Sequence, residues 1–224
     1  MGQIDELARL LWTLKDWDVV DVGAGDGGFA AELAARGARV IGLEVEAGKV
    51  ARAQAAHGDV AQFLQGYAEA LPLPDYSADL MTFIHSFHHI PQAHYGAATD
   101  EAMRVLRIGG RLHVAEPDLD GNVTQIVQPL DDETEVRTAA AAHLRSLPNF
   151  TPLVLVEQSR IVLRRRCADF DALARNLIGV SPDRAAAFPA ARAEMRARFD
   201  RLSERDEAGF TLTQPVTIYH FQKT

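Results

Sequence analysis

The sequence has little of several features that would place a protein in a specialised class. Its one cysteine, Cys167, cannot form a disulfide within the chain. No stretch approaches the roughly eighteen uncharged apolar residues of a membrane span, and no apolar leader opens the chain. Basic residues are not in excess, because 23 lysines and arginines stand against 31 acids and give a net charge of −8. We therefore expect a cytoplasmic protein that binds neither nucleic acid nor membrane.

One stretch, VVDVGAGDGGFAAEL over residues 19–33, organises the rest of the chain. Its short apolar run, interrupted only by Asp21, predicts a strand, and the alanine-rich end predicts a helix. Between them stand four glycines within six residues. Glycine lets the backbone approach a ligand closely, and the start of a helix offers unpaired N–H groups. The stretch therefore predicts a turn that holds a nucleotide.

The following segments continue the alternation of strands and helices. We expect strands over residues 39–45, 61–66 and 80–84, and a helix over 49–57 between the first two. Short links between such elements indicate a parallel sheet with right-handed crossovers. An amphipathic helix over residues 1–17 precedes them. After residue 117 the pattern changes to helices interrupted by a strand over 157–165, with a last strand over 216–222.

Glu44 ends an otherwise apolar strand, and an acidic side chain at this position indicates a functional role. Beside the glycine turn it can accept hydrogen bonds from both hydroxyls of a ribose. Because ligands of open α/β sheets bind beyond the carboxyl ends of the strands, residues 67–69 and the region of His85 should converge on the same place.

Two glycine templates fit the turn. The spacing of Gly23, Gly25 and Gly28 also satisfies the dinucleotide pattern GxGxxG, and Glu44 lies near the distance that this pattern expects. A nicotinamide-dinucleotide enzyme is therefore an alternative. Against it, Asp21 lies inside the first strand, and LRIGGRL follows a helix, a combination that the dinucleotide pattern lacks.

Five segments in order resemble class I S-adenosylmethionine-dependent methyltransferases of the small-molecule type. They are VVDVGAGDGG, IGLEVE, GYAEALPLP, DLMTFIHSFHHI and EAMRVLRIGGRLHVAEP. The resemblance implies an α/β fold with a doubly wound, Rossmann-like sheet of seven strands, mostly parallel with an antiparallel last strand. It also implies helices on both faces and helical insertions after strands five and six. Residues 1–224 would form one domain, with an N-terminal helix (1–17), a cofactor-binding half (18–117) and a substrate-side half (118–224).

The resemblance also assigns cofactor-binding residues for S-adenosylmethionine and its product S-adenosylhomocysteine. Asp21 would lie near the methionine end, Glu44 would bind the ribose and Val45 would pack on the adenine. Tyr67 stands where the family most often has an aspartate that contacts the adenine amino group. The full set is Asp21, Gly23, Ala24, Gly25, Glu44, Val45, Tyr67, Ala68, Glu69 and Ile84.

Methyl transfer depends mainly on proximity and alignment, so the sequence needs to supply little chemistry of its own. His85, at the end of the fourth strand, is the candidate catalytic base. His85, His88 and His89 lack an accompanying acid motif such as HExxH, so we expect no metal. We expect methyl transfer to a small-molecule acceptor. A module that binds the cofactor without turnover is a further alternative, and the oligomeric state stays open.

Overall fold

The computed structural model describes residues 3–11, 13–179, 182–207 and 209–224, and the chain forms two compact units. The first unit comprises residues 1–116, 138–159 and 217–224, and the second comprises 117–137 and 160–216. Four of the described elements run from one unit into the other: helix α6 (Thr134–Ser146) and strands β5 (Leu106–Pro117, by its last residue), β6 (Leu153–Cys167) and β8 (Gly209–Lys223). No helix of the described residues is both long and apolar enough to cross a bilayer.

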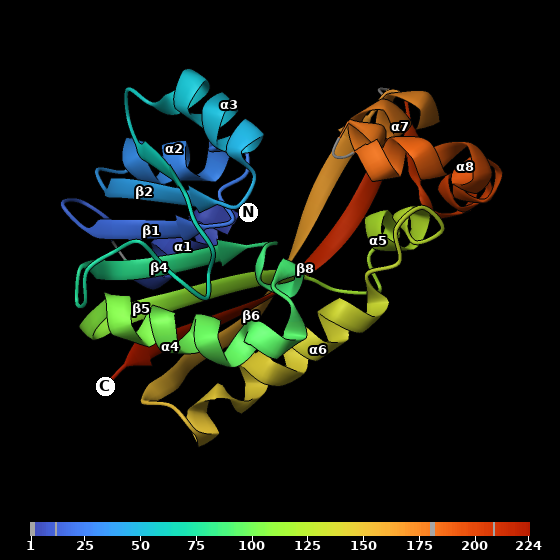
Figure 1. Cartoon of the computed structure of the whole chain (residues 1–224). Helices are drawn as coiled ribbons and strands as arrows, with labels where there is room; N and C mark the ends of the chain where they lie inside the picture. The colour runs from blue at the N-terminus through green and yellow to red at the C-terminus, as the bar shows by residue number, and fades with distance from the viewer. Residues whose placement is uncertain (1–2, 12, 180–181, 208) are drawn as a thin grey trace. The chain divides into compact units, whose positions relative to one another are not determined.

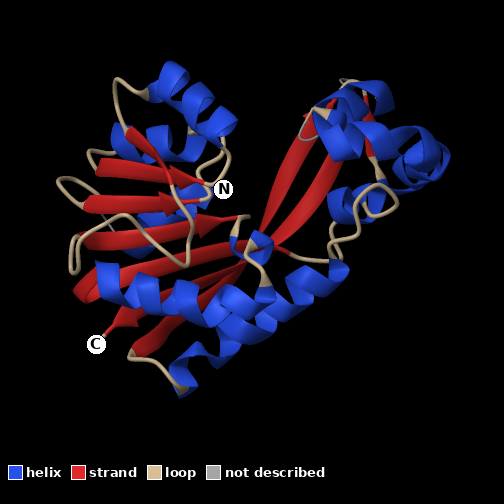
Figure 2. Ribbon diagram, viewed as in Figure 1, coloured by secondary structure: helices blue, strands red, loops and turns tan. Residues whose placement is uncertain are grey.

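The first unit alternates strands and helices in the predicted order (Figure 2). Its elements are α1 (Gln3–Leu11), β1 (Asp18–Val22), α2 (Gly28–Ala35), β2 (Arg39–Glu44), α3 (Ala47–His57), β3 (Gln62–Gln65), β4 (Ala78–Ile84), α4 (Tyr95–Val105) and β5 (Leu106–Pro117). Short 3-10 helices cover Phe87–His89, Gln92–His94 and Leu147–Asn149. The predicted fold class is confirmed.

The strands follow the order β3-β2-β1-β4-β5-β8-β6, and Figure 1 shows β2, β1, β4 and β5 side by side in this order. The five strands from β3 to β5 pair in parallel. β8 runs antiparallel to β5. Arg111 contacts Gln222 and His113 contacts His220, so the residue numbers rise along β5 while those of their partners fall along β8. The antiparallel last strand is therefore confirmed.

Side chains alternate between the two faces of the sheet, as the period of two requires. One face carries Val19, Val40 and Leu80 and packs against apolar residues of α1, α2 and α3. The opposite face carries Val20 and Met81 and packs against α4 and the part of α6 that belongs to the first unit. Helices therefore cover both faces, and the carboxyl ends of the strands form the edge available to a ligand.

Several boundaries differ from the sequence predictions. The N-terminal helix covers residues 3–11 instead of 1–17, and the chain turns at Asp16, whose φ of 65° excludes a right-handed helix at that position. Met1, Gly2 and Trp12 of that prediction lie outside the described residues. β6 and β8 are longer than predicted. In β6 exposed side chains alternate with half-buried or buried ones from Leu153 to Leu163, beyond the apolar positions on which the prediction rested. A short additional strand, β7 (Glu204–Asp206), pairs with β8.

The second unit is mostly helical. It contains α5 (Asn122–Val127), α7 (Phe170–Ile178) and α8 (Pro182–Leu202), which are the helical insertions predicted after strands five and six. The Asp169 carboxylate caps α7 by accepting the Ala172 N–H at 2.7 Å. Phe170, Met195 and Phe199 are almost fully buried and form the centre of this unit's own core. The prediction that residues 118–224 face the substrate stays a prediction.

Candidate functional site

The glycine turn after β1 is held against the end of β2. The N–H groups of Gly23 and Ala24 both donate to the Leu43 carbonyl oxygen, at 2.8 and 2.9 Å. Gly23 has φ 77°, and a Cβ at this position would lie 2.4 Å from the Cβ of Ser86, so only glycine fits. Gly25 has φ 59° but open space around it. The backbone at Gly25 is therefore accessible to a ligand at close range.

Glu44 lies against this turn, as the sequence predicted. Its side chain is buried, and its carboxylate accepts three backbone N–H groups, from Gly25 at 3.0 Å, Val45 at 2.9 Å and Glu46 at 3.1 Å. A carboxylate offers about four acceptor positions. The hydrogen bonds of the described residues therefore leave room for about one ligand hydroxyl, and a second hydroxyl would have to replace the Gly25 N–H.

Asp21 lies below the turn, on the face of the sheet that α1, α2 and α3 cover. It is opposite Thr82 in the register of β1 and β4, and the Thr82 hydroxyl donates to its carboxylate at 2.7 Å. Asp21 is 2% exposed, and burial raises its pKa to about 6 although the Thr82 hydrogen bond acts in the opposite direction. A carboxylate that titrates near neutral pH is typical of functional sites.

The loop after β3 joins the same edge. The Gly66 N–H donates to the Glu44 carbonyl oxygen at 3.1 Å, which brings the following residues alongside β2. Tyr67 and Val45 expose 55% and 46% of their surface, so both offer apolar surface to a ring. The Ala68 side chain packs in the core, which limits its predicted role to the backbone. Glu69 accepts a hydrogen bond from His94 at 2.8 Å.

The turn after β4 carries His85 and connects to both neighbouring strands. Ile84 and His85 are half-buried, and the His85 N–H donates to the Ala115 carbonyl oxygen of β5 at 2.8 Å. His85 has φ 54°, a left-handed conformation that costs a non-glycine residue about 1 kcal/mol and that occurs often at functional sites. The Ser86 hydroxyl donates to the Val22 carbonyl oxygen at 2.6 Å. The turn thus lies directly beside the glycine turn.

Sequence reasoning missed Thr82 and Glu116, whereas it placed Ser86 and His88 after the fourth strand but singled out His85 there. Glu116 is buried near the carboxyl end of β5, where it accepts the Phe87 N–H and contacts the His88 ring. The signal was present, because an acid directly after the apolar run LHVA repeats the pattern that identified Glu44. Thr82 has no comparable local signal, since its partner Asp21 lies on another strand.

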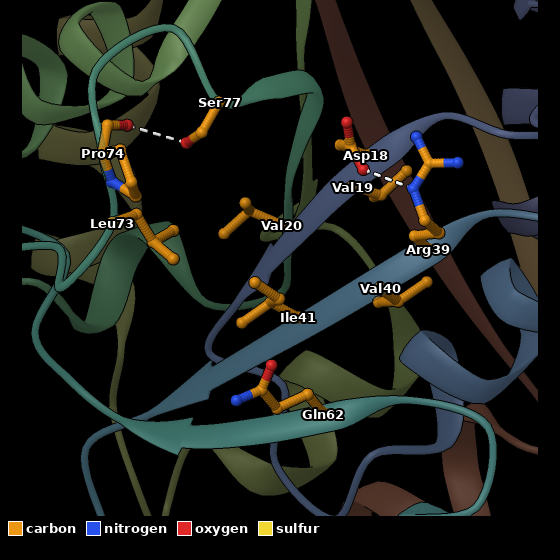
Figure 3. A pocket seen from close by; sticks show the side chains of 10 residues that line it. All are labelled: Asp18, Val19, Val20, Arg39, Val40, Ile41, Gln62, Leu73, Pro74 and Ser77. Carbon is orange, nitrogen blue, oxygen red and sulfur yellow. Dashed lines mark hydrogen bonds and ion pairs between the residues drawn. The ribbon is translucent and has the colours of Figure 1, made fainter.

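A pocket of about 280 Å³ lies at the opposite ends of the strands (Figure 3). An ion pair between Asp18 and Arg39, at 2.7 Å, lies beside it, and both residues begin their strands. The residues that line it are Asp18, Val19, Val20, Arg39, Val40, Ile41, Gln62, Leu73, Pro74 and Ser77. Because the glycine turn follows the carboxyl end of β1, this pocket is separate from the candidate cofactor site.

Comparison with known proteins bears on the part of the chain that holds the glycine turn. The family model described as a methyltransferase domain matches residues 20–114, which include the glycine turn, Glu44 and the turn after β4. The other predicted cofactor residues also lie within these bounds, and the five segments of the sequence resemblance fall largely within them.

Curated relatives match part of this chain over part of their own length. A demethylmenaquinone methyltransferase of Clavibacter sepedonicus is 34% identical over 100 residues, which are 44% of this chain and 40% of that protein. The 27-O-demethylrifamycin SV methyltransferase of Amycolatopsis mediterranei is 35% identical over 118 residues, which are 50% of this chain and 43% of that protein. The chain therefore matches less than half the length of these relatives.

Solved structures share the fold over the whole chain. The YcgJ protein of Bacillus subtilis is similar with a TM-score of 0.65 at 20% identity, covering 98% of this chain and 97% of that one. The cyclase SpnF is similar with a TM-score of 0.59 at 18% identity, covering 98% of this chain and 79% of that one. Since a cyclase also shares the fold of this chain, the activity has to be argued from the site.

Proposed function

We propose that this protein transfers a methyl group from S-adenosylmethionine to a small-molecule acceptor. The convergence of the Gly25 N–H and the Glu44 carboxylate, 3.0 Å apart, is the observation that carries the proposal. It joins an accessible backbone to an acid suited to a ribose hydroxyl, within a segment matched by the methyltransferase domain model. Bound S-adenosylmethionine supplies an electrophilic methyl group, so the protein has to align the acceptor with it.

The remaining predicted residues take roles that their surroundings support. Gly23, Ala24 and Gly25 would border the methionine and ribose, and Asp21 would act from beneath as a buried carboxylate. The exposed rings and methyl groups of Val45 and Tyr67 suit a base that packs between them. Glu69 and the Ala68 backbone would border the adenine edge, and Ile84 and His85 would lie toward the acceptor. We propose that residues 118–224 provide the acceptor side.

Calorimetry with S-adenosylhomocysteine tests the cofactor assignment. Replacing Glu44 by Gln removes a charged acceptor, whose hydrogen bonds are each worth about 1.5–3 kcal/mol, so we expect the Kd to rise about 10- to 100-fold. Glu46→Gln is the matched control, because Glu46 lies two residues beyond Glu44, just before α3, and its side chain is 61% exposed. We expect the control to change the Kd by less than about twofold.

The alternatives predict different outcomes of the same titration. Tight NAD binding without S-adenosylhomocysteine binding would favour a nicotinamide enzyme. Binding of S-adenosylhomocysteine without turnover would favour a module that has no transfer activity. The acceptor panel begins with demethylmenaquinone and 27-O-demethylrifamycin SV, the compounds in the names of the two relatives. Release of S-adenosylhomocysteine from S-adenosylmethionine with any acceptor of the panel would support the proposal.

A further inference from the structure

The pocket at the amino ends of the strands is built on one face of the sheet. In the register of β1, β2 and β3, Val20 lies opposite Ile41, and Ile41 lies opposite Gln62. Side chains paired in this way point to the same face, so the three form one row across three strands (Figure 3). Asp18 and Arg39 are paired two residues earlier and form a second row on that face. The pocket therefore has an apolar centre, an amide at one end and an ion pair beside it.

The crossover above this row contains no helix. The chain passes from β3 to β4 through residues 66–77, all of them described, and none of them is helical. Parallel strands are usually joined by a helix that packs on the sheet. Here a loop takes its place and leaves a pocket of about 280 Å³ between itself and the strands. Since a cavity of about 150 Å³ can bind benzene, this pocket has room for about two fused rings.

The loop that forms the other wall of the pocket is held in place by α4. Arg104 donates to the carbonyl oxygens of Leu71 and Leu73, at 3.1 and 2.7 Å. The Ser77 N–H donates to the Val105 carbonyl oxygen at 2.8 Å, at the point where the loop enters β4. The loop is therefore anchored near both ends of the segment that lines the pocket. Its shape exists before a ligand binds, as is usual for small-molecule sites.

Gln62 supplies the specific polar group of the pocket. It continues the apolar row of Val20 and Ile41 onto β3, and β3 is the edge strand of the sheet. Within the described part of the chain its side-chain amide makes no hydrogen bond. An amide presents a donor beside an acceptor, and Gln pairs in this way with the edge of adenine. A planar ring that lies on Val20 and Ile41 would present its edge to this amide.

The charges beside the pocket balance one another. Asp18 pairs with Arg39 at 2.7 Å and with Arg107 at 2.9 Å, and Arg107 also pairs with Asp79 at 2.8 Å. Two acids thus stand against two arginines. An ionised ligand would lose hydration on entering the pocket without gaining an unpaired opposite charge. The pocket therefore favours a neutral ligand.

We propose that this pocket binds a neutral, planar heterobicycle whose edge carries a hydrogen-bond donor beside an acceptor, the class that includes the purine and pteridine bases. The ring lies on Val20 and Ile41, between the sheet and the loop, and its edge pairs with the Gln62 amide. The site is separate from the one proposed for S-adenosylmethionine, so the inference does not rest on the proposed function. A solvated edge of the sheet is the simpler reading, and under it the Gln62 amide has no part in binding.

Quinazolin-4-one is the probe, because it is a neutral lactam of two fused rings with an N–H beside a carbonyl oxygen. Titrated into the isotope-labelled full chain, it should shift the methyl signals of Val20 and Ile41 and the side-chain amide signal of Gln62. We expect a Kd of about 1 mM, which is usual for a ligand of this size. Quinoline has the same size but no N–H, so it should bind about fivefold more weakly through the loss of one hydrogen bond. Each titration is run with and without excess S-adenosylhomocysteine.

Gln62→Leu tests the role of the amide, because it keeps the approximate size of the side chain and removes both hydrogen-bonding groups. The Kd for quinazolin-4-one should rise about tenfold. Gln65→Leu is the matched control, since Gln65 belongs to the same strand but lies on the opposite face of the sheet. It should change the Kd by less than about twofold. Both glutamines are exposed, so the melting temperatures should stay close to that of the wild type.

Every outcome of these titrations decides the inference. Shifts at the pocket that saturate, with weaker binding in Gln62→Leu and unchanged binding in Gln65→Leu, support it. The inference is overturned by unshifted pocket signals up to about 10 mM probe, by equal binding of quinoline, or by an unchanged Kd in Gln62→Leu. Shifts confined to Val45 and Tyr67, abolished by S-adenosylhomocysteine, also overturn it, because they place the probe in the cofactor site. A failure of S-adenosylhomocysteine to bind would count against the proposed function alone.

Discussion

Asp21 offers a prediction whose size follows from the structure. Burial raises the pKa of this carboxyl from 3.8 to about 6. At about 1.4 kcal/mol for each pH unit, keeping it ionised in the folded protein costs about 3 kcal/mol at pH 8. Asp21→Asn removes that cost and keeps an oxygen for the Thr82 hydroxyl. The buried amide N–H groups of the new Asn side chain need hydrogen-bond acceptors, which offsets about 1 kcal/mol of the stabilisation. We therefore expect the free energy of unfolding to rise by about 2 kcal/mol.

The pH dependence distinguishes this cause from a simple packing change. Below pH 3.8 Asp21 is protonated in both the folded and the unfolded protein, so its ionisation costs nothing there. As the pH rises from 3.8 to 6 the unfolded state loses its proton first, and the wild type loses stability relative to Asp21→Asn. Above pH 6 the difference in unfolding free energy between the wild type and Asp21→Asn is constant. Near pH 8 the gain should raise the melting temperature by about 4–8 °C.

Two other buried groups titrate in the opposite sense. Burial lowers the pKa of His113 to about 3 and that of His220 to about 4. The unfolded state therefore binds protons first as the pH falls below 6.5, and the folded protein loses stability in acid. Both effects act in the wild type and in Asp21→Asn alike, so the difference between the two unfolding curves isolates Asp21. A difference that does not change between pH 4 and 8, or a less stable variant at pH 8, would refute the reasoning.

Two further predictions concern the framework of the site. Gly23→Ala should lower the free energy of unfolding by about 3 kcal/mol, because φ at this position is positive and the new Cβ would lie 2.4 Å from the Cβ of Ser86. Gly25→Ala should lower it by about 1 kcal/mol, because there only φ is unfavourable. Urea titration that ranked them in reverse order would contradict this reading. Arg104→Met removes the hydrogen bonds that the Arg104 guanidinium donates to Glu101 and to the Leu71 and Leu73 carbonyl oxygens. Backbone hydrogen exchange should therefore become faster over residues 71–75. Exchange at the wild-type rate in this segment would contradict the prediction.

The sequence predicts those parts of the fold that depend on local pattern. The glycine turn follows from its own residues, and the contact between Glu44 and Gly25 follows from β2 being the neighbour of β1. The order of the parallel strands follows from right-handed crossovers. In each case a short segment and a general rule suffice, without knowledge of the exact register between strands.

The parts that escaped prediction depend on register. Thr82 is a partner of Asp21 only because β1 and β4 align residue 21 with residue 82. Glu116 meets His88 only because the end of β5 lies beside the turn after β4. The full length of β6 was missed for another reason, since its alternation continues through polar residues. Pairings across strands are therefore what sequence pattern alone does not supply here.

Acidic residues at the two ends of the sheet differ in how deeply they are buried. At the amino ends, Asp18 and Asp79 keep about a third of their side chains exposed, at 34% and 33%, and form ion pairs with Arg39 and Arg107. Such exposed pairs are inexpensive to form and contribute little to stability. They need no explanation beyond a solvated strand end, and the pocket beside them lies far along the strands from the glycine turn.

The carboxyl ends of β1, β2 and β5 instead hold acids that are almost fully buried. Asp21, Glu44 and Glu116 are 2%, 7% and 5% exposed. Their hydrogen-bond donors are a hydroxyl, backbone N–H groups and one imidazole, none of them a permanent cation. For Asp21 the cost of burial outweighs the single Thr82 hydrogen bond, as its raised pKa indicates. Three such acids at one edge are therefore better explained by a ligand that needs them, and Asp21→Asn should become more stable while binding S-adenosylhomocysteine less tightly.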